Sequence, residues 1–219
     1  MSHREARGHV VAVTIDRPER RNALDHAALD GLAAALAACG DDVRALVLTG
    51  AGGHFCAGAD LTGLEDAAFA DRLRTVLIGL RSAPFVTLAA VDGAALGAGT
   101  QLAVACDLRV ATPGASFGIP AGRLGLAVDA WTVERLSLLA GPGPARAMLL
   151  AAEVVKGDEA HRVGFVQRLG ARKRGACDDP LHVVLDDLGF RHEGARAEHR
   201  EGRAVQHVGR AEVLTEDVG

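Results

Sequence analysis

Short apolar runs alternate with stretches of helical periodicity along the first 170 residues of the chain. Runs rich in valine, leucine and isoleucine predict buried strands at residues 9–15, 45–49 and 85–91. Apolar residues spaced three and four apart predict helices that begin near Asp25 and that span residues 71–80. Strands that alternate with helices are typical of the α/β fold class, and we expect this chain to belong to it.

Shorter elements follow the third strand. The same patterns predict helices at residues 101–105, 129–140, 144–151 and 158–163, and short strands at residues 108–111 and 165–169. From residue 171 to residue 219 the composition changes: 18 of these 49 residues are charged, compared with 34 of the first 170, and no long apolar stripe is visible. We therefore expect a folded core at residues 1–170 and a weakly ordered C-terminal segment at residues 171–219.

Charge and cysteine content argue against several classes of function. The formal net charge is −4 without a basic stripe, which argues against a nucleic-acid partner. The four cysteines, Cys39, Cys56, Cys106 and Cys177, include no pair at CxxC spacing, so neither a metal site nor a disulfide framework is predicted. No apolar run is long enough to cross a membrane, and residues 1–8 lack the apolar stretch of a signal peptide. We expect a cytoplasmic protein without a membrane partner.

Two loops of small residues carry the candidate chemistry. FCAGADL at residues 55–61 and DGAALGAGTQ at residues 92–101 each lead into a predicted helix. Glycine lets the backbone approach a ligand closely, and the first N–H groups of a helix can bind a negatively polarised oxygen. The loops predict either an oxyanion hole made by the N–H groups of Ala57 and Ala98 or two tight strand-to-helix turns. The dinucleotide-binding fingerprint fails, because Leu102 stands where its last glycine should be.

These loops, together with CDLR at residues 106–109, resemble the enoyl-CoA hydratase/isomerase (crotonase) family from about residue 9 to residue 170. The resemblance implies a repeated ββα spiral, followed by a C-terminal helical region that covers the acyl site and helps to form homotrimers or hexamers. It also implies an acyl-CoA thioester as ligand or substrate, with no other cofactor. Because residues 171–219 are shorter than such a region and rich in charge, we interpret them as diverged or frameshifted, which would weaken a trimer interface.

The resemblance also assigns roles to single residues. The N–H groups of Ala57 and Ala98 would hold the thioester carbonyl, while Arg20 and Arg21 are candidates for the CoA phosphates, although exposed arginines commonly contact only solvent. Asp107 and Arg109 are expected to form structural hydrogen bonds. The remaining residues expected along the ligand are Gly58, Ala59, Asp60, Leu61, Gly97, Gln101, Ala121 and Trp131, of which Trp131 forms either pocket wall or core.

Two departures from the family pattern concern catalysis. Family hydratases use two glutamates as acid and base, and the matching positions hold Gln101 and Ala121. Each missing acid or base is worth roughly 10²- to 10⁴-fold in rate, so we expect little hydration. With these replacements the chain resembles mycobacterial-type members of the family, which implies binding and transfer of fatty acyl-CoA rather than turnover.

One carboxylate remains at a position that matters in some family isomerases. Asp129 could move a proton between two carbons as a single acid/base, or it could cap the helix predicted to follow it. Two functions therefore stay open: an acyl-CoA-binding protein without hydratase activity, and an enoyl-CoA isomerase or residual hydratase that uses Asp129.

Overall fold

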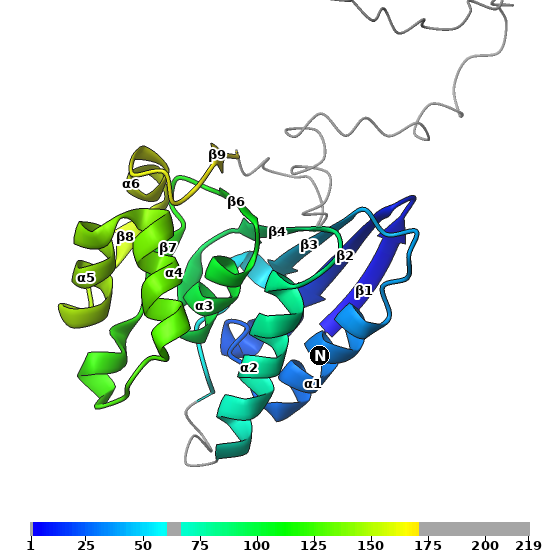
Figure 1. Cartoon of the computed structure of the whole chain (residues 1–219), viewed down its shortest axis with the longest axis horizontal. Helices are drawn as coiled ribbons and strands as arrows, with labels where there is room; N and C mark the ends of the chain where they lie inside the picture. Colours follow the sequence, from blue (N-terminus) through cyan, green and yellow to red (C-terminus); the bar gives the residue numbers. More distant parts are fainter. Residues whose placement is uncertain (1, 61–66, 171–219) are drawn as a thin grey trace, which may run out of the picture.

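A six-stranded sheet runs through the part of the chain that the computed structural model describes, residues 2–60 and 67–170 (Figure 1). Its strands lie in the order β1-β2-β3-β4-β6-β9. The first pair is antiparallel and every other neighbouring pair is parallel. The strands are β1 (Ser2–Arg7), β2 (Val10–Ile15), β3 (Ala45–Gly50), β4 (Val86–Val91), β6 (Leu108–Ala111) and β9 (Arg168–Leu169).

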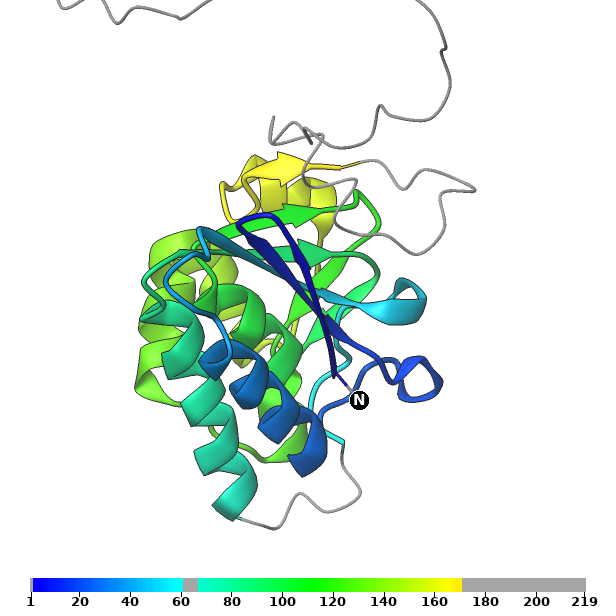
Figure 2. The ribbon, with the colours of Figure 1, turned by 90° about the vertical axis from the view of Figure 1, so that its right-hand side faces the viewer.

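Helices cover one face of this sheet (Figure 2). Alternation along β2 shows how the sequence sets the two faces: Val11, Val13 and Ile15 belong to the main core with the helices, whereas Ala12 joins a smaller apolar cluster on the other face. The helices of the described chain are α1 (His26–Ala37), α2 (Ala67–Arg81), α3 (Ala98–Ala105), α4 (Ala130–Ala140), α5 (Pro142–Leu150) and α6 (Gly157–Arg162). The predicted α/β class is confirmed.

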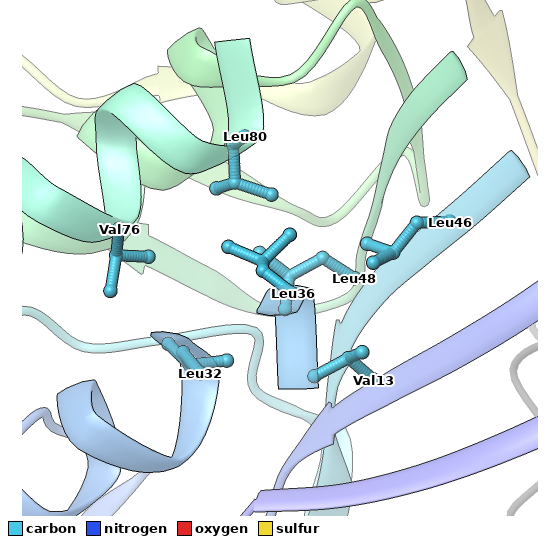
Figure 3. Close-up of a pocket in the computed structure, with 7 residues that line it drawn as sticks. All are labelled: Val13, Leu32, Leu36, Leu46, Leu48, Val76 and Leu80. Carbon is cyan, nitrogen blue, oxygen red and sulfur yellow. The ribbon is translucent and has the colours of Figure 1, made fainter. Parts of the chain in front are cut away.

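A small apolar pocket lies between the sheet and the helices α1 and α2 (Figure 3). Strands β2 and β3 contribute three of the side chains around it, and the two helices contribute the others. The lining residues are Val13, Leu32, Leu36, Leu46, Leu48, Val76 and Leu80. Because no polar group lines it, this pocket belongs to the packing of the core rather than to a site for chemistry.

A second sheet, in the order β5-β7-β8, supports the start of α3. It consists of β5 (Ala94–Leu96), β7 (Ser116–Gly118) and β8 (Val155–Lys156). The buried Thr100 hydroxyl joins α3 to this sheet: its Oγ1 lies 2.6 Å from Ala95 O and accepts a hydrogen bond from Gly118 N at 3.0 Å. The first turn of α3 is thereby attached to two strands.

A buried arginine holds the other end of α3. Arg109 is only 1 % exposed, and its guanidinium donates to the carbonyls of Ala103 (3.1 Å), Cys106 (2.9 Å) and Phe165 (2.6 Å). Burial lowers the pKa of Arg109 to about 10, because the charged form has lost its water. Asp107 in turn accepts from the Thr87 N–H at 2.8 Å. The predicted structural roles of Asp107 and Arg109 are confirmed.

The structure corrects several element boundaries. Strand β1 was not predicted, because its sequence SHREAR is polar and it lies at the edge of the sheet with mostly exposed side chains. Helix α3 begins at Ala98, three residues before the predicted start, since Gly97 serves as its N-cap. The strand predicted at 165–169 is reduced to β9. The predictions for residues 171–219 lie outside the described residues.

Candidate functional site

The two small-residue loops meet. The first loop runs alongside β5: Cys56 N donates to Ala94 O at 2.8 Å, and Leu96 N donates to Cys56 O at 2.9 Å. At the end of this pairing the glycines of the two loops touch, because a Cβ atom added to Gly97 would lie 3.8 Å from the Cα of Gly58. Both glycines have positive φ, 112° at Gly58 and 54° at Gly97, a conformation that side chains rarely permit.

The first turn of α3 is packed directly on the first loop. A Cβ atom added to Gly99 would lie 2.2 Å from Cys56 O, closer than any real contact. A Cβ atom added to Gly58 would lie 3.1 Å from Leu96 O and 4.0 Å from Ala98 N. The small residues of both loops are therefore needed for the close approach of two backbones.

The segment that precedes α1 lies on the other side of the first loop. Ala57 N donates to Arg21 O at 3.0 Å, Leu24 N donates to Gly58 O at 2.8 Å, and Asp60 N donates to Leu24 O at 2.7 Å. The prediction that Ala57 offers a free N–H group is therefore wrong. Its hydrogen is already used to hold the loop in place.

Ala59 carries the free donor of this loop instead. In the parallel bridge between Leu24 and Ala59, the Leu24 backbone bonds to the residues on either side of Ala59, so the N–H of Ala59 points away from Leu24. That is the side on which β5 and α3 lie. Within residues 2–60 and 67–170, no acceptor pairs with this N–H group. Ala59 was predicted only as a residue along the ligand.

Ala98 supplies the second free donor, as predicted. It is the first residue of α3 and 7 % exposed, and its N–H group has no acceptor in the described part of the chain. Its neighbours are fixed: Gly97 N donates to Gly118 O at 2.8 Å, and Gln101 N donates to Gly97 O at 3.1 Å. The helix dipole adds positive potential at this position. Two free N–H groups thus flank the point where Gly58 meets Gly97.

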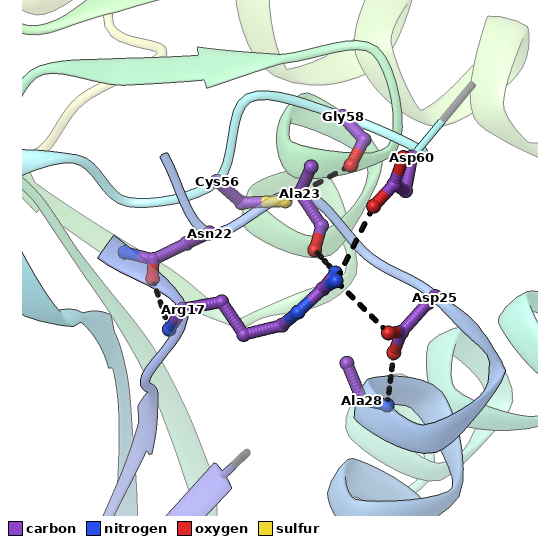
Figure 4. A network of polar contacts seen from close by, with 8 residues as sticks. All are labelled: Arg17, Asn22, Ala23, Asp25, Ala28, Cys56, Gly58 and Asp60. Atoms are coloured by element: carbon purple, nitrogen blue, oxygen red, sulfur yellow. Dashed lines mark hydrogen bonds and ion pairs between the residues drawn. The ribbon is translucent and has the colours of Figure 1, made fainter. Parts of the chain in front are cut away.

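An arginine network fastens the first loop (Figure 4). The Arg17 guanidinium donates to Ala23 O and binds the carboxylates of Asp25 at 3.0 Å and Asp60 at 3.2 Å. Asp60 is therefore engaged as a partner of Arg17, in addition to its predicted place along the ligand. The predicted phosphate ligands Arg20 and Arg21 are both exposed beside this network.

Asn22 completes the attachment of that loop. It is fully buried with φ of 59°, and its Nδ2 donates to His54 O at 2.6 Å and Ala51 O at 2.8 Å, while its Oδ1 accepts from Arg17 N at 2.8 Å. The roles of Arg17 and Asn22 were not predicted. Asn22 bonds to carbonyls 29 and 32 residues later and Arg17 bonds to Asp60, 43 residues later, and contacts at such separations leave no local pattern in the sequence.

Side chains of α3 and α4 meet at Gln101, three residues after the Ala98 donor. Asp129 caps α4, because its Oδ1 accepts from Thr132 N at 2.9 Å and its Oδ2 accepts from the Thr132 hydroxyl at 2.7 Å. Gln101 Nε2 donates to the same Asp129 Oδ2 at 3.2 Å and to Thr132 Oγ1 at 3.1 Å. The cap interpretation of Asp129 is confirmed, and the structure brings Gln101 and Asp129 together as neighbours.

The other predicted ligand residues have mixed outcomes. Ala121, in the short helix η3 (Pro120–Leu124), and Trp131, on α4, are partly buried and pack against the main core. The Arg81 guanidinium carbon lies 5.2 Å from the centre of the Trp131 ring, a cation–π distance. Leu61 lies outside the described residues.

Other routes to catalysis find little support in the described chain. Burial raises the pKa of the Cys56 and Cys106 thiols to about 12, so both stay protonated near neutral pH and are poor nucleophiles. The described residues contain no group of three or more histidine, cysteine or acidic side chains that could hold a metal ion. Within the same residues, no helix is long and apolar enough to span a membrane.

Comparison with known proteins gives consistent matches. The family model for enoyl-CoA hydratase/isomerase matches residues 5–174. "Probable enoyl-CoA hydratase echA6" of Mycobacterium tuberculosis is 46 % identical over 163 residues, which cover 74 % of this chain and 67 % of that protein. "Short-chain-enoyl-CoA hydratase" of Clostridium acetobutylicum is 35 % identical over 174 residues, covering 75 % of this chain and 67 % of that protein. The crystal structure of an enoyl-CoA hydratase from Bacillus anthracis superposes with a TM-score of 0.74 at 30 % identity, covering 86 % of this chain and 73 % of that one.

Proposed function

The chain belongs to the enoyl-CoA hydratase/isomerase family, and from this premise we propose that it binds acyl-CoA thioesters through two backbone N–H groups and lacks hydratase activity. The predicted family and its crotonase-type α/β fold are both confirmed by the comparisons. The specific ligand, the role of each residue and the absence of hydration are our proposal.

The free N–H groups of Ala59 and Ala98 carry the proposal. An N–H group without a partner in a partly buried position is costly unless a ligand supplies an acceptor. Two such groups, one on each side of the contact between Gly58 and Gly97, suit one carbonyl oxygen with partial negative charge, such as that of a thioester. Because both donors are backbone groups, they depend on the loop conformation and not on side-chain chemistry.

The residues around this carbonyl site support binding without hydration. Water addition needs a base and an acid, and neither the Gln101 amide nor the Ala121 methyl group can transfer a proton near neutral pH. Asp129 is the nearby carboxylate, but Thr132 and Gln101 occupy its two oxygens with hydrogen bonds. We therefore rank isomerisation by Asp129 second. It remains a candidate because Asp129 contacts Gln101, one helical turn from Ala98.

Features outside the carbonyl site complete the proposal. The exposed Arg20 and Arg21 lie beside the first loop, where they could contact the phosphates of CoA. Two leucines on α4 and α5 are strongly exposed, Leu138 at 74 % and Leu150 at 81 %, as an interface in a homotrimer or hexamer would require. We assign the protein to the cytoplasm and to fatty-acid metabolism as parts of the same proposal.

Titration and turnover measurements test the proposal together. We expect a saturated acyl-CoA to bind in isothermal titration calorimetry, and we expect no loss of absorbance from 2-enoyl-CoA and no conversion of 3-enoyl-CoA. Conversion of 3-enoyl-CoA that disappears in Asp129→Asn would establish the isomerase instead. This variant is a suitable control because asparagine also caps helices. Hydration of 2-enoyl-CoA by the unaltered protein would overturn the absence of hydratase activity.

A further inference from the structure

The hydrogen bonds between α3 and α4 determine which way the Gln101 amide points. Thr132 has one hydroxyl proton, and it lies on the 2.7 Å hydrogen bond to Asp129 Oδ2. The remaining lone pairs of Thr132 Oγ1 can only accept, and so can Asp129 Oδ2. The Gln101 atom that lies 3.1 Å and 3.2 Å from these two oxygens must therefore be the donor Nε2. The opposite orientation would place three acceptor oxygens against one another.

The fixed amide leaves its oxygen on the other side. Among the described residues no group donates to Gln101 Oε1. Gln101 lies three residues after Ala98 on the same face of α3, and side chains on a helix lean toward its N-terminus. The acceptor Oε1 is therefore presented over the turn of the helix whose first N–H group is free.

The spacing suits a group on the acyl chain. Residues 98 and 101 are separated by about 4.5 Å along the helix axis, at 1.5 Å per residue. Carbon 3 of an acyl group lies two carbon–carbon bonds of about 1.5 Å each beyond its carbonyl carbon. A thioester whose oxygen is bound by Ala98 can thus bring a substituent on carbon 3 near the Gln101 amide.

We propose that Gln101 Oε1 is a hydrogen-bond acceptor that makes the site selective for acyl thioesters with a hydroxyl group on carbon 3. The inference rests on the proposed binding of acyl thioesters. A 3-hydroxyl group donates to Oε1, a saturated chain leaves that oxygen without a partner, and a 3-keto oxygen places two acceptors against each other. Asp129 and Thr132 act as positioning residues, because they hold the amide in the orientation that offers its oxygen.

Calorimetric titration with three CoA thioesters of one chain length tests the inference: octanoyl, 3-hydroxyoctanoyl and 3-ketooctanoyl. We expect the hydroxy thioester to bind about fivefold to tenfold more tightly than the saturated one, and the keto thioester to bind most weakly. In Gln101→Met, which keeps the length and loses the polar group, we expect the affinities for the hydroxy and saturated thioesters to agree within about twofold.

Asp129→Asn is the sharper variant because it should turn the amide around. Thr132 N requires the oxygen of the introduced asparagine for the helix cap, so the NH₂ group of that side chain takes the place of Oδ2 and faces Gln101. Gln101 then accepts from that NH₂ group and presents its own Nε2 to the ligand. We expect the preference to reverse, so that the keto thioester binds more tightly than the hydroxy thioester. A purely structural role of Asp129 would change the two affinities equally.

The outcomes separate the inference from the proposed function. If octanoyl-CoA binds but the hydroxy thioester binds no more tightly, the role of Gln101 is overturned and the proposed function stands. If none of the three thioesters binds, both are overturned. If the hydroxy preference is present and Asp129→Asn leaves it unchanged, the orientation argument is wrong.

Discussion

The first loop and the start of α3 present backbone N–H groups to the candidate site, whereas Gln101, one turn later on α3, and Asp129, the N-cap of α4, provide side chains beside it. On the backbone side, the loop and the start of α3 are held by hydrogen bonds to strands, by the close approach of glycines and by the Arg17 network. On the side-chain side, the sequence has Gln101 and Ala121 at the two positions where the resemblance to the family implies the glutamates of a hydratase. A single substitution changes the chemistry of a side chain, but a backbone donor is lost only when the loop itself is deformed.

Gly99→Ala should have the largest effect, because it disrupts the contact between the first loop and the start of α3. The added Cβ atom would lie 2.2 Å from Cys56 O, so the start of α3 and the first loop must separate. We expect the free energy of unfolding in urea to fall by about 3 kcal/mol, together with loss of acyl-CoA binding. Gly114→Ala is the matched control, since nothing lies within 4 Å of its added Cβ atom. Equal stability of the two variants would contradict the tight approach of the loops.

Arg17→Met, which also loosens the first loop, should lower the free energy of unfolding by less. The Arg17 and Asp60 side chains are only 16 % and 13 % exposed, so the variant leaves a largely buried carboxylate without its arginine. We expect a loss of about 2 kcal/mol in urea unfolding, with weaker acyl-CoA binding as the first loop loosens. Arg74→Met, at an exposed position on α2, controls for the loss of a charge. A stable Arg17→Met protein with full affinity would mean that the network does not hold the loop.

Ala98→Pro removes one donor while keeping the loop. Proline is tolerated at the first position of a helix. The preceding residue, Gly97, can keep its positive φ because it is a glycine. Losing one hydrogen bond to the thioester should weaken acyl-CoA binding by about 1 kcal/mol, roughly fivefold, as measured by calorimetry. Ala98→Ser, which retains the N–H group, should bind nearly as well as the unaltered chain. Equal affinities of the two variants would argue against Ala98 as a donor.

The smallest effect is expected at the exposed Arg20 and Arg21, which are not part of the carbonyl site. Changing Arg20 and Arg21 together to serine should weaken acyl-CoA binding by about 0.5 kcal/mol, because exposed ion pairs are screened by water and salt. The loss should shrink further as salt is added. An acyl-pantetheine thioester, which lacks the nucleotide phosphates, is the matched ligand. If its affinity falls by as much, these arginines do not act through the phosphates.

The sequence predicted the loops but not which of their atoms are free. Strands β2, β3, β4 and β6, the helix that follows Asp25 and the donor at Ala98 could be predicted because periodicity, capping and glycine are local signals. The choice between Ala57 and Ala59 could not, since it depends on hydrogen bonds to Arg21 and Leu24, which lie far from both alanines along the chain. The local sequence around Asp129 allowed both a helix cap and an acid/base. Its contact with Gln101 could not be predicted, because it depends on how α3 packs against α4.

The buried Arg109 has a consequence for the order in which the chain becomes able to fold during synthesis. The Arg109 guanidinium donates to Phe165 O, 56 residues later, and the backbone N–H of Arg109 donates to Gln167 Oε1, 58 residues later. Until those residues have left the ribosome, the C-terminal end of α3 carries a cation that lacks part of its binding partners. The start of α3, with the free N–H of Ala98, has its supporting strands once Gly118 is made, whereas the C-terminal end of the same helix is completed only by Phe165 and Gln167. Chains that end before Phe165 should therefore be less stable than chains that reach Gly170, which contain every described partner of Arg109.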